Sequence, residues 1–164
     1  MMKKTLLVLS LLATATTQAD TGKIVFTGKL QDTTCTVTAS HTAVNMGAVK
    51  TAVLGAAGNT ANPQEITFDF AACGALTKAR VAFDGVRDTA DTGLHKNTAT
   101  TPAANVALGI YEADGVTPVP YSVSAKDITL STTGSAKYIA KMVATGEAEA
   151  GNFESNVTYH ISYL

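Results

Sequence analysis

Two cysteines, Cys35 and Cys73, are the residues whose types and spacing point to a definite chemistry in this sequence. They could form a disulfide, act as a redox pair or contribute to a metal site. Redox pairs typically have the close C-x-x-C spacing, and two cysteines with three scattered histidines match no zinc pattern. If the chain is exported, one structural disulfide is the simplest interpretation, because oxidising compartments favour such bridges.

The remaining candidates for catalysis or metal binding do not form a recognisable pattern. The three histidines are far apart in the sequence, and neither H-E-x-x-H nor G-x-S-x-G occurs. Three acidic residues lie close together around a glycine turn: Asp84, Asp88 and Asp91. Their spacing is not the D-x-D-x-D-G of a calcium loop, so a solvated loop is favoured. The sequence gives no positive argument for an enzyme, a metal ion or a cofactor.

The first 19 residues have the layout of a secretory signal peptide. Lys3 and Lys4 precede an apolar run from Leu6 to Ala13, and small polar residues lead to a cleavage site expected after Ala19. The apolar run is too short to cross a bilayer. The part that follows, residues 20–164, has the size of one domain and a slight acidic excess with scattered basic residues. Nucleic acid is therefore a poor candidate for a partner.

Alternating apolar and polar residues predict β-strands along most of the remaining chain. The clearest strands lie in TTCTVTAS, EITFDFAAC, ARVAFDG, AKYIAKMVATGE and SNVTYHISYL. NVALGIYEADGVTPVPYSV predicts a strand, a turn at Asp114 and Gly115, and a return with two prolines that belongs at an edge. Cys73 is out of phase with the strand before it, so a bulge or strand end is expected near Ala71 and Ala72. Residues 52–64 and 88–105 are rich in Gly, Asn, Thr and Ala and predict exposed loops. This pattern predicts an antiparallel β-sandwich.

Strand patterns also occupy both ends of the part that follows residue 19. At the start, DTGKIVFTGKL places Gly22, Ile24, Phe26 and Gly28 on one side. At the end, Val157, Tyr159, Ile161 and Tyr163 share one side of a strand that continues almost to the last residue. From the pattern alone, these segments could be two ordinary edge strands of one sandwich.

The ordered set of segments resembles a pilin of the chaperone–usher family, of the type 1 and P fimbrial kind. GKIVFTGKLQDTTC resembles the start of the family's chain up to the first cysteine, and FAAC followed by VAFDGVRD resembles the second cysteine and the next strand. NVALGIYEADG and YIAKMVATGEAEAGNFESNVTYHISYL resemble the later segments. The penultimate residue is a tyrosine, Tyr163, and the fourteenth residue from the end is a glycine, Gly151, as is usual in the family.

The resemblance implies an all-β, incomplete immunoglobulin-like antiparallel sandwich that lacks its last strand, in residues 31–164. A periplasmic chaperone lends a strand to the resulting groove, and at the outer-membrane usher the N-terminal arm of a neighbouring subunit replaces it. Residues 20–30 are then the donor-strand arm, with Gly22, Ile24, Phe26 and Gly28 on the inserted face. The groove edge, which also binds the chaperone, comprises Gly151, Val157, Tyr159, Ile161 and Tyr163. The implied role is a structural subunit of a surface fimbrium that supports cell adhesion.

Two other interpretations belong to different functional classes. A self-contained secreted sandwich could recognise a ligand through loops around residues 86–105, and an enzyme is a more distant alternative. Within the pilin interpretation, residues 20–164 leave no room for a separate lectin domain, so a shaft or adaptor subunit is favoured.

Overall fold

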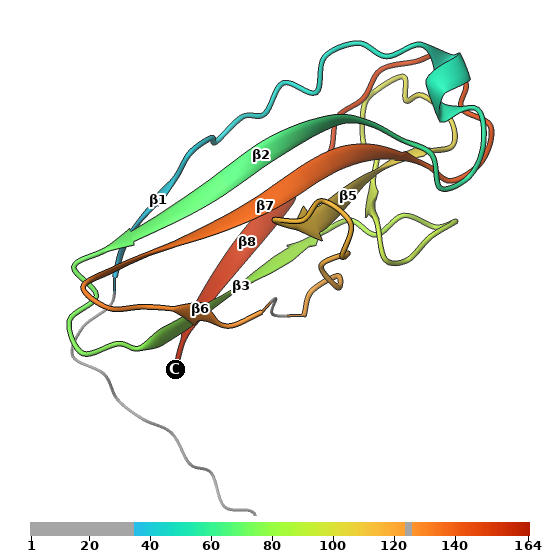
Figure 1. Ribbon diagram of the computed structural model, residues 1–164. Helices are drawn as coiled ribbons and strands as arrows, with labels where there is room; N and C mark the ends of the chain where they lie inside the picture. The colour runs from blue at the N-terminus through green and yellow to red at the C-terminus, as the bar shows by residue number, and fades with distance from the viewer. Residues whose placement is uncertain (1–34, 124–125) are drawn as a thin grey trace, which may run out of the picture. The chain divides into compact units, whose positions relative to one another are not determined.

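The computed structural model describes residues 35–123 and 126–164 (Figure 1). The signal peptide predicted at residues 1–19 and the donor-strand arm predicted at residues 20–30 lie outside the described residues. The inserted-face positions Gly22, Ile24, Phe26 and Gly28 therefore stay predictions, as does the start of the pilin domain at residue 31.

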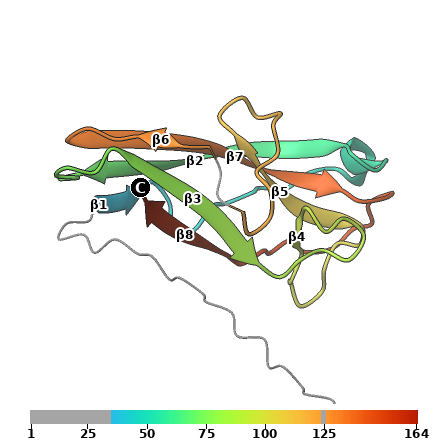
Figure 2. The same ribbon diagram turned by 90° about the horizontal axis from the view of Figure 1, so that it is seen from below.

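Antiparallel strands form two sheets (Figures 1 and 2). The larger sheet has the spatial order β1 (Thr36–Ala39), β2 (Thr60–Ala71), β7 (Thr133–Ala144), β5 (Val106–Glu112) and β4 (His95–Lys96). The smaller sheet has the order β6 (Ile128–Thr129), β3 (Lys78–Gly85) and β8 (Val157–Tyr163). The prediction of an all-β antiparallel sandwich is confirmed. A single 3-10 turn, η1 (Thr51–Leu54), is the only helical element of the described chain.

The core lies between the sheets and follows the predicted alternation. Phe68 and Phe70 on β2 and Val81 on β3 are at most 1% exposed, whereas the residues between them along β2 face solvent or are partly exposed. The Phe83 ring lies 4.9 Å from the Tyr138 ring, centroid to centroid, in an edge-to-face arrangement. Burial raises the pKa of Tyr138 to about 12, with a further contribution from Glu112. Side-chain alternation is sufficient to place this part of the core.

A disulfide joins Cys35 to Cys73, as predicted. Cys35 directly precedes β1, and Cys73 follows the end of β2 at Ala71. Between them, Ala72 has a φ of 54°, which breaks the strand and turns the next side chain inward. Both cysteines are buried, so the bridge ties the paired ends of β1 and β2 to the core.

The prediction of an exposed loop at residues 52–64 is wrong in part. β2 already begins at Thr60, and Leu54 in η1 is only 1% exposed. The composition predicted a loop here, yet β2 includes Pro63, which cannot donate to a strand ladder. The chain accommodates it with a register shift between Ala61 and Gln64, where Asn62 has a φ of 48°.

The prediction for residues 88–105 is also wrong in part. Leu94, His95 and Asn97 are buried, and His95 and Lys96 form β4 against β5. Leu94 packs with Ala107 and Val143 in a small apolar cluster. Ala107 on β5 and Val143 on β7 are next to the core residues Leu108 and Met142 along their strands, and so point to the other side of the sheet. The cluster therefore covers the face of the larger sheet opposite the core. A few buried residues in a polar run carry too weak a periodic signal to be recognised.

The turn after β5 forms at Asp114 and Gly115, as predicted. Gly115 has a φ of 67°, which glycine adopts without strain. Hydrogen bonds from the Thr117 hydroxyl and from the backbone N–H groups of Val116 and Thr117 lower the pKa of Asp114 to about 2. The returning segment, which contains two prolines, bridges β5 only at Pro118 and Tyr111, consistent with the expected edge position.

Candidate functional site

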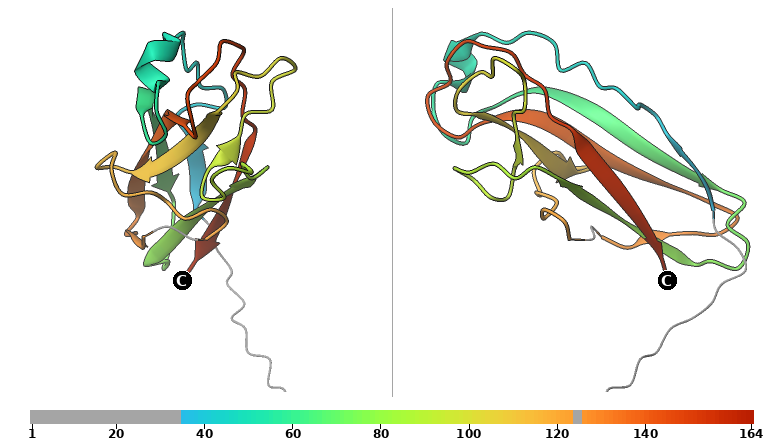
Figure 3. Two further views of the ribbon diagram at one scale, coloured as in Figure 1. Left: turned by 90° about the vertical axis from the view of Figure 1, so that its right-hand side faces the viewer. Right: turned by 180° about the vertical axis from the view of Figure 1, so that it is seen from behind.

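An apolar groove of about 860 Å³ opens between the two sheets. One side is the end of β1 and the segment that follows it, and the other is the start of β8 and the segment that precedes it. Among the described strands, β1 pairs only with β2 and β8 pairs only with β3. Each sheet therefore presents a strand edge that no described strand covers, and Figure 3 shows β8, in red, at the edge of its sheet.

Core side chains of four strands form the floor of the groove. They come from β2, β3, β5 and β7, and they are mostly large and apolar: Ile66, Phe68, Phe83, Leu108, Ile110, Ala140 and Met142. These side chains are continuous with the two main hydrophobic clusters of the sandwich. The groove is thus an opening into the core rather than a shallow depression of the surface.

β8 is much less buried than its partner strand. On β3, Ala79, Val81 and Phe83 are at most 3% exposed, and the pairing register places them opposite Tyr163, Ile161 and Tyr159. On β8, none of the corresponding residues is fully buried, and Tyr159 is 46% exposed although its ring lies 4.8 Å from that of Phe68. Among the described residues, no strand covers the inward face of β8 on the side away from β3.

The predicted groove-edge residues divide into two groups. Gly151, Val157 and Tyr159 line the groove. Ile161 and Tyr163 share a face of β8 with Val157 and Tyr159, but they lie outside the groove lining and pack against the cluster that contains both cysteines. Burial raises the pKa of Tyr163, while a hydrogen bond from the backbone of Cys35 opposes that shift. The sheets are therefore closed on each other at the disulfide end and open at the other.

Gly151 lies where two backbone segments approach closely. A Cβ at this position would be 2.6 Å from the Cα of Ala103, closer than real side chains approach. Pro102 and Asn152 form an isolated parallel bridge beside it. A glycine is therefore required here for contact between the two segments, which gives a physical reason for its place in the sequence pattern.

We expect Gly151→Ala to destabilise the fold by about 1–3 kcal/mol, because the added methyl group must push residues 102–103 away from residue 152. Urea unfolding followed by circular dichroism measures the change. Gly93→Ala is the control, because its added Cβ would meet only the Asp91 side chain, at 3.2 Å, and should cost less than about 0.5 kcal/mol. Equal midpoints for the two variants would contradict the packing role of Gly151.

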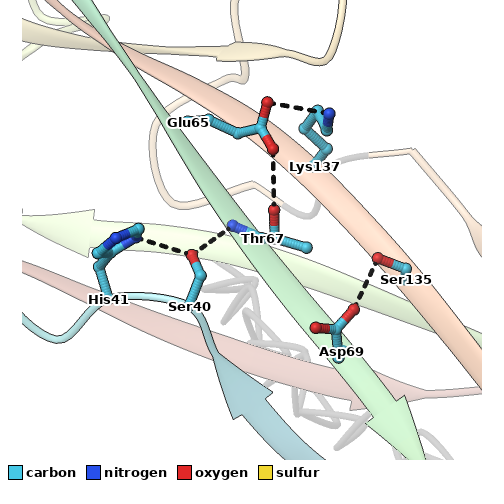
Figure 4. A network of polar contacts seen from close by, with 7 residues as sticks. All are labelled: Ser40, His41, Glu65, Thr67, Asp69, Ser135 and Lys137. Atoms are coloured by element: carbon cyan, nitrogen blue, oxygen red, sulfur yellow. Dashed lines mark hydrogen bonds and ion pairs between the residues drawn. The ribbon is translucent and has the colours of Figure 1, made fainter.

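Polar residues elsewhere form surface networks. On the face of the larger sheet away from the core, the Lys137 ammonium lies 2.9 Å from Glu65, and the Ser135 hydroxyl donates to Asp69 at 2.9 Å (Figure 4). The Ser40 hydroxyl accepts a hydrogen bond from the Thr67 N–H at 2.9 Å, which extends the pairing of β1 with β2 by one residue. The contact between Ser40 and His41 therefore lies at the end of this strand pair. Exposed contacts of this kind contribute little to stability.

The acidic cluster shapes a turn, and the buried His95 is uncharged. The Asp88 carboxylate accepts the N–H groups of Ala90 and Asp91 in a turn. Burial lowers the pKa of His95, although Asp84 opposes the shift, so the imidazole is neutral at pH 7. Within the described ranges, no group of three or more His, Cys, Asp or Glu residues is arranged to hold a metal ion.

Comparison with known proteins assigns the chain to a family. The family model described as "Fimbrial protein" matches residues 24–164. The chain belongs to the fimbrial protein family. The F17 fimbrial protein of Escherichia coli is 31% identical over 179 residues, covering 99% of this chain and 99% of the relative. The family consists of structural subunits of fimbriae on the cell surface, and this chain is one of them.

Solved structures confirm the fold of this fimbrial subunit. The crystal structure of the P pilus rod subunit PapA has a TM-score of 0.65 at 16% identity, and the match covers 79% of this chain and 99% of PapA. A chaperone–usher pilus structure also has a TM-score of 0.65, at 19% identity, covering 92% of this chain and 99% of its own. The described chain therefore has the fold of pilus subunits, as the resemblance implied, and the family match confirms that it is a fimbrial subunit.

Sequence reasoning missed residues that shape the groove of this fimbrial subunit. Met46 and Phe153 line the groove from segments outside the regular strands. The buried Asn97 donates a hydrogen bond to the backbone of Asn152, beside Phe153. An isolated methionine or asparagine in a polar run gives no periodic signal, so no local pattern could have identified them.

The described chain has no helix long and apolar enough to span a membrane.

Proposed function

We propose that the groove is an acceptor site for an extended strand from another polypeptide, and that this strand is residues 20–30 of a neighbouring subunit in the assembled fimbria. The half-exposed inward face of β8, beside an apolar groove of about 860 Å³, is the observation that carries the proposal. An inserted strand could pair with the free edge of β8 and cover that face. This is β-strand addition to a sheet edge.

The sequence of residues 20–30 suits such an insertion. Ile24, Phe26 and Leu30 share one side of the segment with Gly22 and Gly28. Burial of three large apolar side chains contributes about 1.5–3 kcal/mol each, or on the order of 5–9 kcal/mol together. That is comparable to the total stability of an ordinary domain, about 5–15 kcal/mol. The donor strand is therefore a substantial part of the subunit's final stability.

The same physics requires a partner before assembly. A free strand edge beside exposed apolar side chains promotes aggregation. We infer that a periplasmic chaperone supplies a temporary strand after export, and that exchange for the neighbour's arm takes place at an outer-membrane usher. Val157, Tyr159, Ile161 and Tyr163 are then the strand to which both partners bind, and Gly151 fixes the segment that precedes it. The assembled fimbria supports cell adhesion.

The alternative of a self-contained module with a ligand-binding loop has less support. Leu94, His95 and Asn97 point into the protein, so much of the loop around residues 86–105 has a structural use. The open groove, in contrast, has no internal use in the described chain.

Site-specific photo-crosslinking tests the proposal. A benzoylphenylalanine in place of Tyr159 is expected to link neighbouring subunits in assembled fimbriae, with the crosslinked peptide mapping to residues 20–30. The control places the same group at Val116, which is 77% exposed on the turn after β5 and does not line the groove. Crosslinks from residue 159 that map only to its own chain, as in self-complementation, would refute exchange between subunits.

A further inference from the structure

Both sides of the groove lose regular strand pairing at its open end. After β1, Met46, Gly47 and Ala48 line the groove outside any strand, and before β8 the same is true of residues 151–156. Backbone groups in irregular segments need other hydrogen-bond partners to hold a fixed position. On each side, an asparagine side chain from elsewhere in the fold provides some of them; before β8, backbone hydrogen bonds between residues 98–103 and 152–154 provide others.

Asn97 holds the segment that precedes β8. Its Oδ1 accepts the N–H of Glu154 at 3.0 Å and that of Ala99 at 3.2 Å. Its Nδ2 donates to the carbonyl oxygens of Asn152 at 2.9 Å and Ala103 at 3.3 Å. Asn97 is only 5% exposed, so these groups have little access to water as an alternative partner. One buried amide thus joins the loop at residues 97–103 to the groove wall at residues 152–154.

Asn62 holds the segment that follows β1. Its Nδ2 donates to the carbonyl oxygens of Met46 at 2.6 Å and Ala48 at 3.4 Å. Asn62 has a φ of 48° at the register shift of β2, a conformation that asparagine tolerates better than most residues. The bulge directs this side chain away from the β2–β7 ladder and toward the groove wall.

We propose that Asn62 and Asn97 are positioning residues that set the spacing of the two groove walls at the open end, and thereby determine how firmly the donor strand is held. The inference rests on the proposed function. Strands hydrogen-bond to neighbours at a spacing of about 4.8 Å, so a wall displaced by an ångström loses both backbone bonds and side-chain contacts with an inserted strand. Neither asparagine needs to touch the donor.

The rate at which a captured donor peptide is released tests this role. The probe is a fluorescent peptide of residues 20–30, bound to the full mature chain and chased with unlabelled peptide. Asn97→Ala and Asn62→Gly, which removes the side chain but tolerates the positive φ, are each expected to speed release about tenfold, since each removes at least two hydrogen bonds from a wall.

Asn105→Gly is the matched control. Asn105 also has a positive φ, 57°, and its Nδ2 donates to a loop carbonyl, that of Glu147, at 2.8 Å. Neither Asn105 nor Glu147 lines the groove. Release from this variant is expected to change less than about threefold. Release from both groove variants at the control rate would overturn the inference, whereas failure of the wild-type chain to capture the peptide would overturn the proposed function instead.

Hydrogen exchange on the wild-type chain provides a test that needs no variant. The Glu154 amide, which donates to Asn97, is expected to exchange as slowly as the paired amides of β3. Exchange as fast as in an exposed loop would show that Asn97 does not fix the wall, whatever the peptide does.

Discussion

Removal of residues 20–27 from the mature chain is expected to abolish polymerisation while leaving the subunit folded in complex with its chaperone. The truncated chain keeps the groove and β8 but has no strand to donate to a neighbour. Since the donor strand contributes on the order of 5–9 kcal/mol by apolar burial, no remaining contact could replace it. Size-exclusion chromatography after periplasmic co-expression with the cognate chaperone measures the outcome, with heat-resistant polymers expected only from the full chain.

Two single substitutions test whether one side of the arm must enter the groove, or whether the arm only has to be present. Phe26→Asp places a charge on the side of the arm predicted to enter the groove, and Thr27→Asp places the same charge on the opposite side. Phe26→Asp should prevent polymerisation, because an unpaired carboxylate is very unfavourable in an apolar groove, and Thr27→Asp should leave it nearly unchanged. Normal polymers from the truncated chain would remove the basis for a donor arm.

Most strands could be predicted because they have one buried face. Ile66, Phe68 and Phe70 alternate with polar residues, and the structure places them inside the sandwich. The out-of-phase Cys73 correctly indicated the break after β2. The start of β2 could not be predicted in the same way. Its inclusion of Pro63 depends on a bulge and on pairing with the distant β7, which local sequence does not encode.

The groove could be predicted only in part. The alternation in the last strand correctly placed Val157, Tyr159, Ile161 and Tyr163 on one face. It did not predict that Tyr159 lines the groove while Tyr163 lies near the disulfide. That division depends on how the two sheets close. The wall contacts made by Asn97 join residues more than 50 positions apart, since the separation to Asn152 is 55. No local sequence pattern predicts a contact over such a separation.

Loss of the disulfide is the second large effect that we expect. Replacement of both Cys35 and Cys73 by alanine should destabilise the subunit by about 4 kcal/mol. In the unfolded chain the bridge closes a loop between two residues that are 38 positions apart, which lowers the entropy of that state. The double variant avoids a buried free thiol or hydroxyl, and urea unfolding of the chaperone-released subunit or the assembled fimbria measures the change. Reduced wild-type protein is the control and should unfold at a similar midpoint.

The position of the disulfide makes its effect on assembly larger than that of an ordinary core bond. Cys35 directly precedes β1, whose end borders the groove, and the Cys35 backbone also forms a hydrogen bond with Tyr163 at the end of β8. Without the bridge, β1 is held to the fold by its pairing with β2 over only four residues. Both borders of the groove should then become mobile at the end where the sheets close. We therefore expect Cys35→Ser to reduce chaperone capture, measured as the fraction of subunit that co-purifies with the chaperone. Full capture of the variant would show that the groove forms without the bridge and that the disulfide acts on stability alone.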